Sequence, residues 1–150
     1  NKSNLIPAFL VGLCGNGIPA FLFTYAETGI NTSLAGMLNA TTPVFTVLIA
    51  VLIFKNKFLP LNYLGVFLGF CGALLLVYFG GGSAGVYQGQ IFYASLVLIA
   101  CFLYGTSVNI MRNYLHSVKP IAITAFSLLS VGIPCLIFLF TTDYLSILSN

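Results

Sequence analysis

Few charges interrupt this chain, and they leave long stretches of sequence that carry no charge at all. The charge-free runs cover residues 3–26, 28–54, 58–111 and 120–142. A membrane-spanning helix needs about 20 mostly apolar residues, so three of these runs fit one helix each and the run 58–111 fits two. A soluble domain carries about 25% charged residues. With 5% charged and 59% hydrophobic residues, this sequence predicts a membrane protein instead.

The longest run is divided by GGGSAGVYQG at residues 80–89, whose glycines are typical of a loop. The predicted spans cover residues about 5–25, 32–54, 60–79, 90–111 and 121–142. The predicted fold class is therefore an all-α membrane protein, a polytopic helical bundle with five transmembrane helices. Residues 1–150 form a single transmembrane domain in this prediction.

The charged residues segregate to the two sides of the predicted membrane. Threading the chain through five spans places every basic residue on one side: Lys2, Lys55, Lys57, Arg112 and Lys119. Glu27 and Asp143 fall on the other side. Because cytoplasmic loops collect Lys and Arg, we expect a multi-pass protein with a cytoplasmic N-terminus. The net charge of +3 is then an orientation signal, and no nucleic-acid partner is expected.

Residue types that carry covalent or metal chemistry are scattered along the chain. The four cysteines, Cys14, Cys71, Cys101 and Cys135, are spread one per span without a close pair. Disulfide frameworks and zinc sites need clustered ligands, so we interpret these thiols as small core residues. His116 and Asp143 are predicted on opposite sides of the membrane, which excludes a Ser-His-Asp triad within this chain. We expect no metal, no cofactor and no enzymatic activity.

Polar side chains lie within the apolar spans. The stretch LNATTPVFTV at 38–47 places Asn39, Thr42 and Thr46 three and four residues apart, on one helical stripe, and Pro43 is predicted to bend the helix beside them. Tyr104 shares a stripe of the fourth span with Ser107 and Met111, and Asn109 lies further round. In the first span, Asn16 stands between two glycines.

Two interpretations of these polar residues stay open at this point. A polar group without a partner in hydrocarbon costs roughly 2–7 kcal/mol, so each should face protein or water. The stripes could line an aqueous cavity for a polar solute, since helices interrupted at mid-depth are typical of transporter sites. They could equally bond to neighbouring helices, or to the backbone four residues back, and hold the bundle together.

The order of motifs resembles the EamA-type permeases of the drug/metabolite transporter superfamily. The matching segments are SLAGMLNATTPVFTVLIAVLIF, the turn KNK, the glycine-patterned LGVFLGFCGALLLV, and GQIFYASLVLIACFLYGTSVNIMR. Gly65 and Gly69 form a G-x-x-x-G face that predicts close helix packing. Two positions depart from the family: Asn56 stands where a Glu is usual, and Tyr104 stands where a Trp is common.

The resemblance implies ten spans arranged as two inverted five-span repeats. Residues 1–79 would end the first repeat and 89–150 would begin the second, so we expect an excerpt of a longer protein. The implied function is a secondary transporter that moves a small polar metabolite, amino acid-like or drug-like, outward across a bacterial inner membrane. The expected partners are the small-molecule solute, the lipid bilayer and a coupling proton or ion. The alternative is a non-transporting membrane scaffold or assembly subunit.

The resemblance also favours the cavity interpretation of the polar residues. The candidate solute-binding set is Asn16, Asn39, Thr42, Pro43, Thr46, Tyr104 and Asn109. A membrane enzyme, such as a lipid-modifying transferase, would need a cluster of His, Asp or Glu at one interface, and the sequence offers none.

Overall fold

The computed structural model describes residues 4–57, 60–80 and 88–141, and this part of the chain folds into helices. The elements are α1 (Leu5–Gly12), η2 (Leu13–Gly17), α2 (Ile18–Ala26), α3 (Thr32–Asn39), α4 (Thr42–Leu52), α5 (Pro60–Gly80), α6 (Gln88–Tyr114) and α7 (Pro120–Thr141). The predicted all-α membrane fold is confirmed.

The described helices match the predicted spans within a few residues. Four stretches are long and apolar enough to cross a membrane: Leu5–Ala26, Thr32–Leu52, Gln90–Tyr114 and Pro120–Ile137. The remaining predicted span, 60–79, is helical as α5, and Tyr63–Gly72 within it is a shorter apolar stretch. Most of the predicted glycine-rich loop, residues 81–87, lies outside the described residues, as does residue 142 at the end of the last predicted span.

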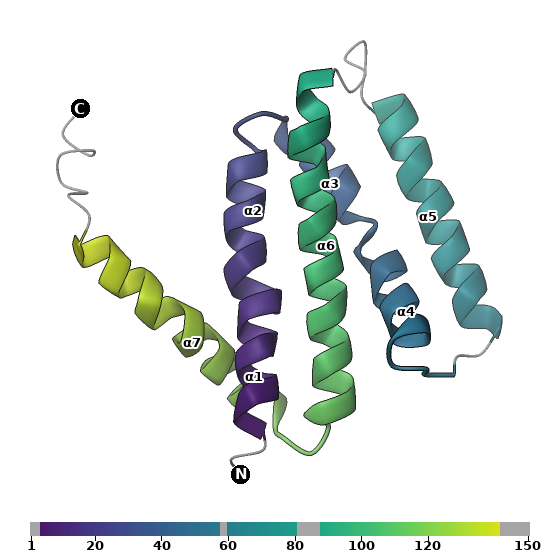
Figure 1. Cartoon of the computed structure of the whole chain (residues 1–150). Helices are drawn as coiled ribbons and strands as arrows, with labels where there is room; N and C mark the ends of the chain where they lie inside the picture. The colour runs from purple at the N-terminus through teal and green to yellow at the C-terminus, as the bar shows by residue number, and fades with distance from the viewer. Residues whose placement is uncertain (1–3, 58–59, 81–87, 142–150) are drawn as a thin grey trace.

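The first span contains one wide helical turn, and a proline accounts for it. Pro19 has no N–H, and its ring would crowd the carbonyl of Gly15 in a regular α-helix. The chain widens there into the π-helical segment η2, in which the Ile18 N–H bonds to the Leu13 carbonyl, five residues back. The turn relieves the clash and lets α1 and α2 continue as one membrane-length rod (Figure 1).

The second span is interrupted, which corrects the prediction of one bent helix over 32–54. The α3 helix ends at Asn39, residues 40–41 form a turn, and α4 begins at Thr42. Pro43 lies in the first turn of α4, where its missing N–H would have no intrahelical partner. The proline therefore starts a new helix and does not bend an existing one.

The long helix α6 lies in the middle of the bundle (Figure 1). It packs against α1, η2 and α2 on one side and against α3 and α4 on the other. The α5 helix contacts α3 and α4 from outside, and α7 contacts α1 and η2 before it diverges from the bundle. One apolar core cluster joins α2, α3 and α6 through Ala26, Ile30, Leu34, Ala35, Val97 and Cys101.

Close helix contacts form at glycines other than those predicted. A Cβ at Gly105 would lie 2.9 Å from the backbone nitrogen of Thr46, so α4 and α6 touch backbone to backbone there. A Cβ at Gly12 would lie 2.9 Å from the carbonyl oxygen of Ser127 in α7. By contrast, no described atom outside the adjoining backbone of α5 lies within 4 Å of a Cβ built at Gly65 or Gly69. Among the described residues the G-x-x-x-G face therefore has no close helix neighbour, and its packing role stays a prediction.

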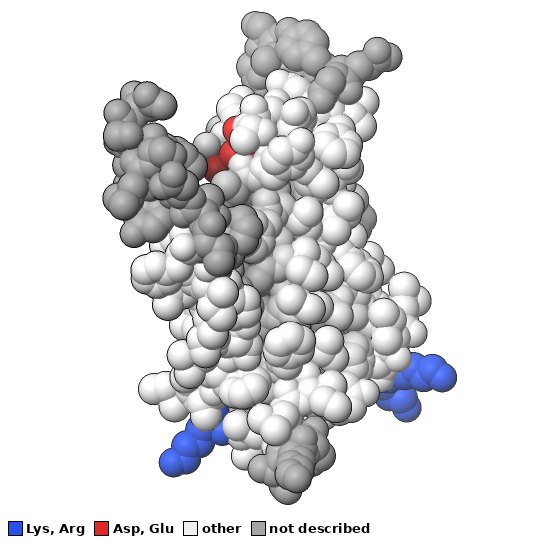
Figure 2. Space-filling model, turned by 60° about the vertical axis from the view of Figure 1, so that its left-hand side comes forward, with Lys and Arg blue, Asp and Glu red and all other residues white. Residues whose placement is uncertain are grey.

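The charged side chains lie at opposite ends of the bundle. Figure 2 shows the described Lys and Arg residues at the lower end, where the α4–α5 and α6–α7 connections lie. The described acidic residue, Glu27, lies toward the other end, directly after α2. This polarity agrees with the predicted threading of the chain through the membrane.

Candidate functional site

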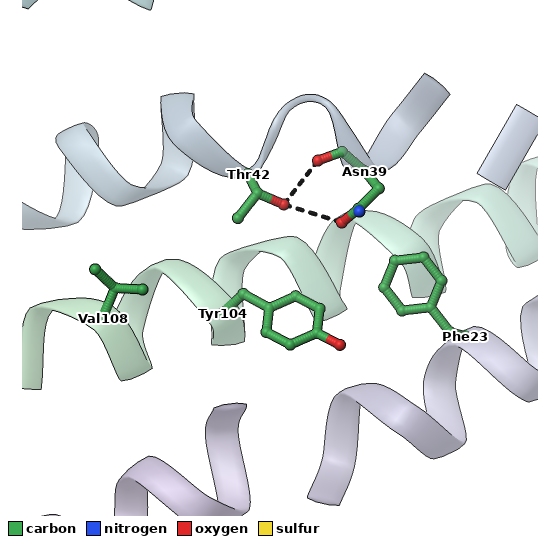
Figure 3. Close-up of a pocket in the computed structure, with 5 residues that line it drawn as sticks. All are labelled: Phe23, Asn39, Thr42, Tyr104 and Val108. Atoms are coloured by element: carbon green, nitrogen blue, oxygen red, sulfur yellow. Dashed lines mark hydrogen bonds between the residues drawn. The ribbon is translucent and has the colours of Figure 1, made fainter. Parts of the chain in front are cut away.

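A pocket of about 510 Å³ opens between α2, α6 and the interrupted α3–α4 span. It is lined by Phe23, Asn39, Thr42, Tyr104 and Val108 (Figure 3). Three of the predicted solute-binding residues, Asn39, Thr42 and Tyr104, therefore share one cavity although they come from two spans. The helix interruption supplies two of them, because Asn39 is the last residue of α3 and Thr42 is the first of α4.

The polar wall of the pocket is a hydrogen-bonded pair that bridges the interruption. The hydroxyl of Thr42 donates to the backbone carbonyl of Asn39 at 2.7 Å and to its Oδ1 at 3.1 Å. Thr42 thus ties the end of α3 to the start of α4. Figure 3 shows the side chain of Asn39 extending from its helix toward the side of the pocket on which Tyr104 lies.

The opposite wall is aromatic. The rings of Phe23 from α2 and Tyr104 from α6 have centroids 6.1 Å apart and planes tilted by 43°. Both side chains are half-buried, so each presents part of its ring to the pocket. The sequence did not predict a role for Phe23, because nothing in its pattern distinguishes this residue from the other 13 phenylalanines of the chain. Val108, one turn beyond Tyr104 on α6, was not predicted either, because no pattern in the sequence distinguishes it from the other aliphatic residues of its span.

Asn109 and Thr46 lie in a packed interface beside the pocket. The side-chain amide of Asn109 is 1% exposed and donates to the backbone carbonyls of Thr46 and Gly105, each at 2.8 Å. The hydroxyl of Thr46 donates to the carbonyl of Thr42 at 2.9 Å, within its own helix. Both side chains therefore donate their hydrogen bonds to protein carbonyls. Their predicted contact with a solute stays a prediction.

The two remaining predicted residues lie outside the pocket lining. Pro43 is exposed in the first turn of α4, and its effect on the site is to begin that helix just after Thr42. Asn16 is exposed on η2 and does not belong to the residues that line the pocket. Its flanking Gly15 faces α6, where an added Cβ would collide with the hydroxyl of Ser107.

The chemistry of the described lining is uncharged. It offers an amide, two hydroxyls, two aromatic rings and an aliphatic side chain. No group of three or more His, Cys, Asp or Glu side chains that could hold a metal ion occurs among the residues that the structure describes. Such a pocket suits a small molecule that carries hydrogen-bonding groups on an apolar or planar body.

Comparison with known proteins gives two matches. Residues 1–78 match the EamA-like transporter family, which is more than half of the chain. The chain is also similar to the protein "Uncharacterized transporter YdfC" of Bacillus subtilis (strain 168), with 27% identity over 135 residues. The aligned region covers 89% of this chain but 43% of that protein, so the chain spans less than half the length of this relative. No solved structure matches the chain.

Proposed function

Because the chain belongs to the EamA-like transporter family, we propose that its pocket is part of the path along which the full-length protein moves a small polar metabolite across the membrane. One observation carries the proposal: an interrupted membrane span turns an amide and a hydroxyl toward a cavity of about 510 Å³. Transporter sites are commonly built at such discontinuous helices, because the interruption frees polar groups at mid-depth. The surrounding chemistry is binding chemistry, and we propose no enzymatic activity.

The proposed solute is amino acid-like or drug-like and is neutral or zwitterionic. The uncharged lining supports this, because an ion bound without a counter-charge would lose its hydration without compensation. The Asn39 amide and Thr42 hydroxyl would bind its polar groups, and Phe23 and Tyr104 would cover its apolar part. A coupling proton or ion is part of the proposal, and efflux is the proposed direction.

The proposed setting is a bacterial inner membrane with the N-terminus in the cytoplasm. The gathering of the described Lys and Arg at one end of the bundle supports this orientation. Residues 1–79 would complete one five-span repeat and 89–150 would begin an inverted second one. The family match ends at residue 78, which supports this division. Rocking of the helices about η2 and the α3–α4 turn would expose the pocket to each side alternately.

A non-transporting scaffold or assembly subunit is the second candidate. One observation favours it: the hydroxyls of Thr42 and Thr46 are already bonded to backbone carbonyls of their own span. In a scaffold these bonds would only shape the bundle, and the pocket would be filled by lipid or by another helix. The two candidates differ in whether the pocket binds a solute.

Counterflow uptake by the full-length protein in proteoliposomes separates the candidates. A panel of labelled amino acids and related metabolites would be tested on the parent and on the double variant Thr42→Val, Tyr104→Ala. We expect uptake of at least one compound by the parent and its loss in the variant. A strict requirement for strongly anionic solutes would contradict the proposed solute class.

The matched control is Thr124→Val combined with Tyr114→Ala. Thr124 makes the same kind of bond, from its hydroxyl to the Pro120 carbonyl, and Tyr114 also packs against a phenylalanine, Phe54. Both residues lie outside the pocket lining. Equal uptake by the two double variants would mean that the pocket is not part of the transport path. If the parent takes up no compound on the panel, the result would favour the scaffold.

A further inference from the structure

A second pocket, of about 240 Å³, lies at the basic end of the bundle. It is formed where the start of α1 meets the α6–α7 connection and the first turns of α7. Its floor consists of Ala8, Leu115 and Ile123, which are 8%, 1% and 4% exposed. Val118 and Phe126 complete an apolar wall. Apart from Asn4, the described lining is apolar, and none of its residues lines the proposed solute site.

The rim of this pocket carries positive charge. Lys119 lies between Val118, which lines the pocket, and Pro120, which begins α7, and its side chain is exposed. Arg112 lies three residues before the buried Leu115 of the lining, and its side chain is also exposed. The N-terminus of α7 adds its partial positive charge at the same place. An apolar hollow with a cationic rim complements a molecule with an apolar chain and an anionic head.

We propose that this pocket binds an anionic phospholipid, with part of one acyl chain in the hollow and the phosphate head against Lys119 and Arg112. Basic pockets between transmembrane helices on the cytoplasmic side select lipids by their head groups. The apolar hollow alone does not discriminate, because every phospholipid offers the same chains. Selectivity comes from the charges on the rim. The site is separate from the solute pocket and does not depend on the proposed transport.

Lipid retention by the purified full-length protein tests the proposal. The protein would be incubated with palmitoyl-oleoyl phosphatidylglycerol or with phosphatidylcholine that has the same chains, and bound lipid would be counted by native mass spectrometry. We expect stronger retention of phosphatidylglycerol, and retention should weaken with added salt. Removing the rim charges in Lys119→Gln and Arg112→Gln should lower its affinity about fivefold for each charge.

Two matched controls isolate the pocket from the general charge of this end. Lys55→Gln with Lys57→Gln removes the same charge from the α4–α5 connection and should leave the affinity within about twofold, since those lysines lie away from the hollow. Ala122→Phe fills the pocket from its exposed lining residue and should lower retention with all charges intact. Ala125→Phe places the same ring on α7 outside the lining and should not.

Three results would overturn the proposal. Equal retention of the two lipids would mean that the head group is not recognised, as expected if other spans of the longer protein cover the pocket. Equal losses in the two charge variants would reduce the effect to a non-specific attraction. Retention unchanged by Ala122→Phe would place the lipid elsewhere.

Discussion

Two asparagines of this bundle, Asn39 and Asn109, show how the same side chain serves two different environments. Asn109 is 1% exposed and binds the backbone carbonyls of α4 and of its own helix, so it joins two helices in a dry contact. Asn39 is exposed at an interrupted span, and its amide faces a pocket. Asn109 is enclosed by protein, whereas Asn39 lines the pocket, although its Oδ1 also accepts from the Thr42 hydroxyl and the Cys101 thiol. The backbone beside each side chain makes the difference.

At Asn109 the glycine at 105 lets two helix backbones touch, which leaves no room for water or solute. At Asn39 the turn at residues 40–41 interrupts the span, and the pocket lies beside this interruption, between the span and helices α2 and α6. In a close helix contact the polar groups of a side chain bond to protein. At a helix interruption some of these groups stay available to bind water or a solute. The predictions below test this distinction, from the largest expected effect on stability to the smallest.

Gly105→Ala should destabilise the protein most. The new methyl would lie 2.9 Å from the Thr46 nitrogen and 3.1 Å from the Phe45 carbonyl carbon, both backbone atoms that move only with their helix. Overpacking of this kind costs about 1–3 kcal/mol in the free energy of unfolding. Unfolding of the full-length protein by sodium dodecyl sulfate, followed by circular dichroism, measures the change. Gly36→Ala is the control, because no described atom outside the adjoining backbone of α3 lies within 4 Å of its Cβ. Equal losses in both variants would mean that α4 and α6 do not touch at Gly105.

Asn109→Leu should have a smaller effect, of about 0.6–1.7 kcal/mol, which is the range of interhelical hydrogen bonds in membranes. The variant removes the bonds to Thr46 and Gly105 while it keeps the volume of the side chain. The same unfolding assay applies, with Asn113→Leu as the control, since that amide donates only within α6, to the Asn109 carbonyl at 2.8 Å. A larger loss in the control would contradict the contact between α4 and α6 that is assigned to Asn109.

Asn39→Ala should leave the free energy of unfolding within about 0.5 kcal/mol of the parent, because an exposed side chain contributes little to stability. Uptake should nevertheless fall, since the variant deletes the amide that faces the pocket. The two assays on one variant therefore separate binding from folding. A stability loss as large as that of Asn109→Leu would show that Asn39 also stabilises the helix packing. The distinction between the two asparagines would then be wrong.

The positions of the helices could be predicted from the sequence, but the contacts between them could not. Charge-free runs placed the helix ends within a few residues, because hydrocarbon excludes charge along the whole span. The predicted stripe of Asn39 and Thr42 assumed one continuous helix, whereas they share a pocket with Tyr104 at an interruption of that span. Asn109, placed further round its helix than Tyr104, was also included in the candidate set, since periodicity within one helix does not tell which neighbour covers a face. Phe23 and the close approach at Gly105 depend on packing between distant segments and left no local signal.

Water access at Thr42 and Ser107 tests the central distinction most directly. Ser107 is 6% exposed and donates to the Val11 carbonyl at 3.2 Å, so it represents the dry interior. Thr42→Cys and Ser107→Cys would be introduced separately into full-length protein whose native cysteines are replaced by alanine. A water-soluble, membrane-impermeant maleimide would then be applied from each side of the membrane. We predict labelling at position 42 and none at position 107. Equal labelling of both positions, or labelling of neither, would contradict an aqueous pocket beside a dry interface.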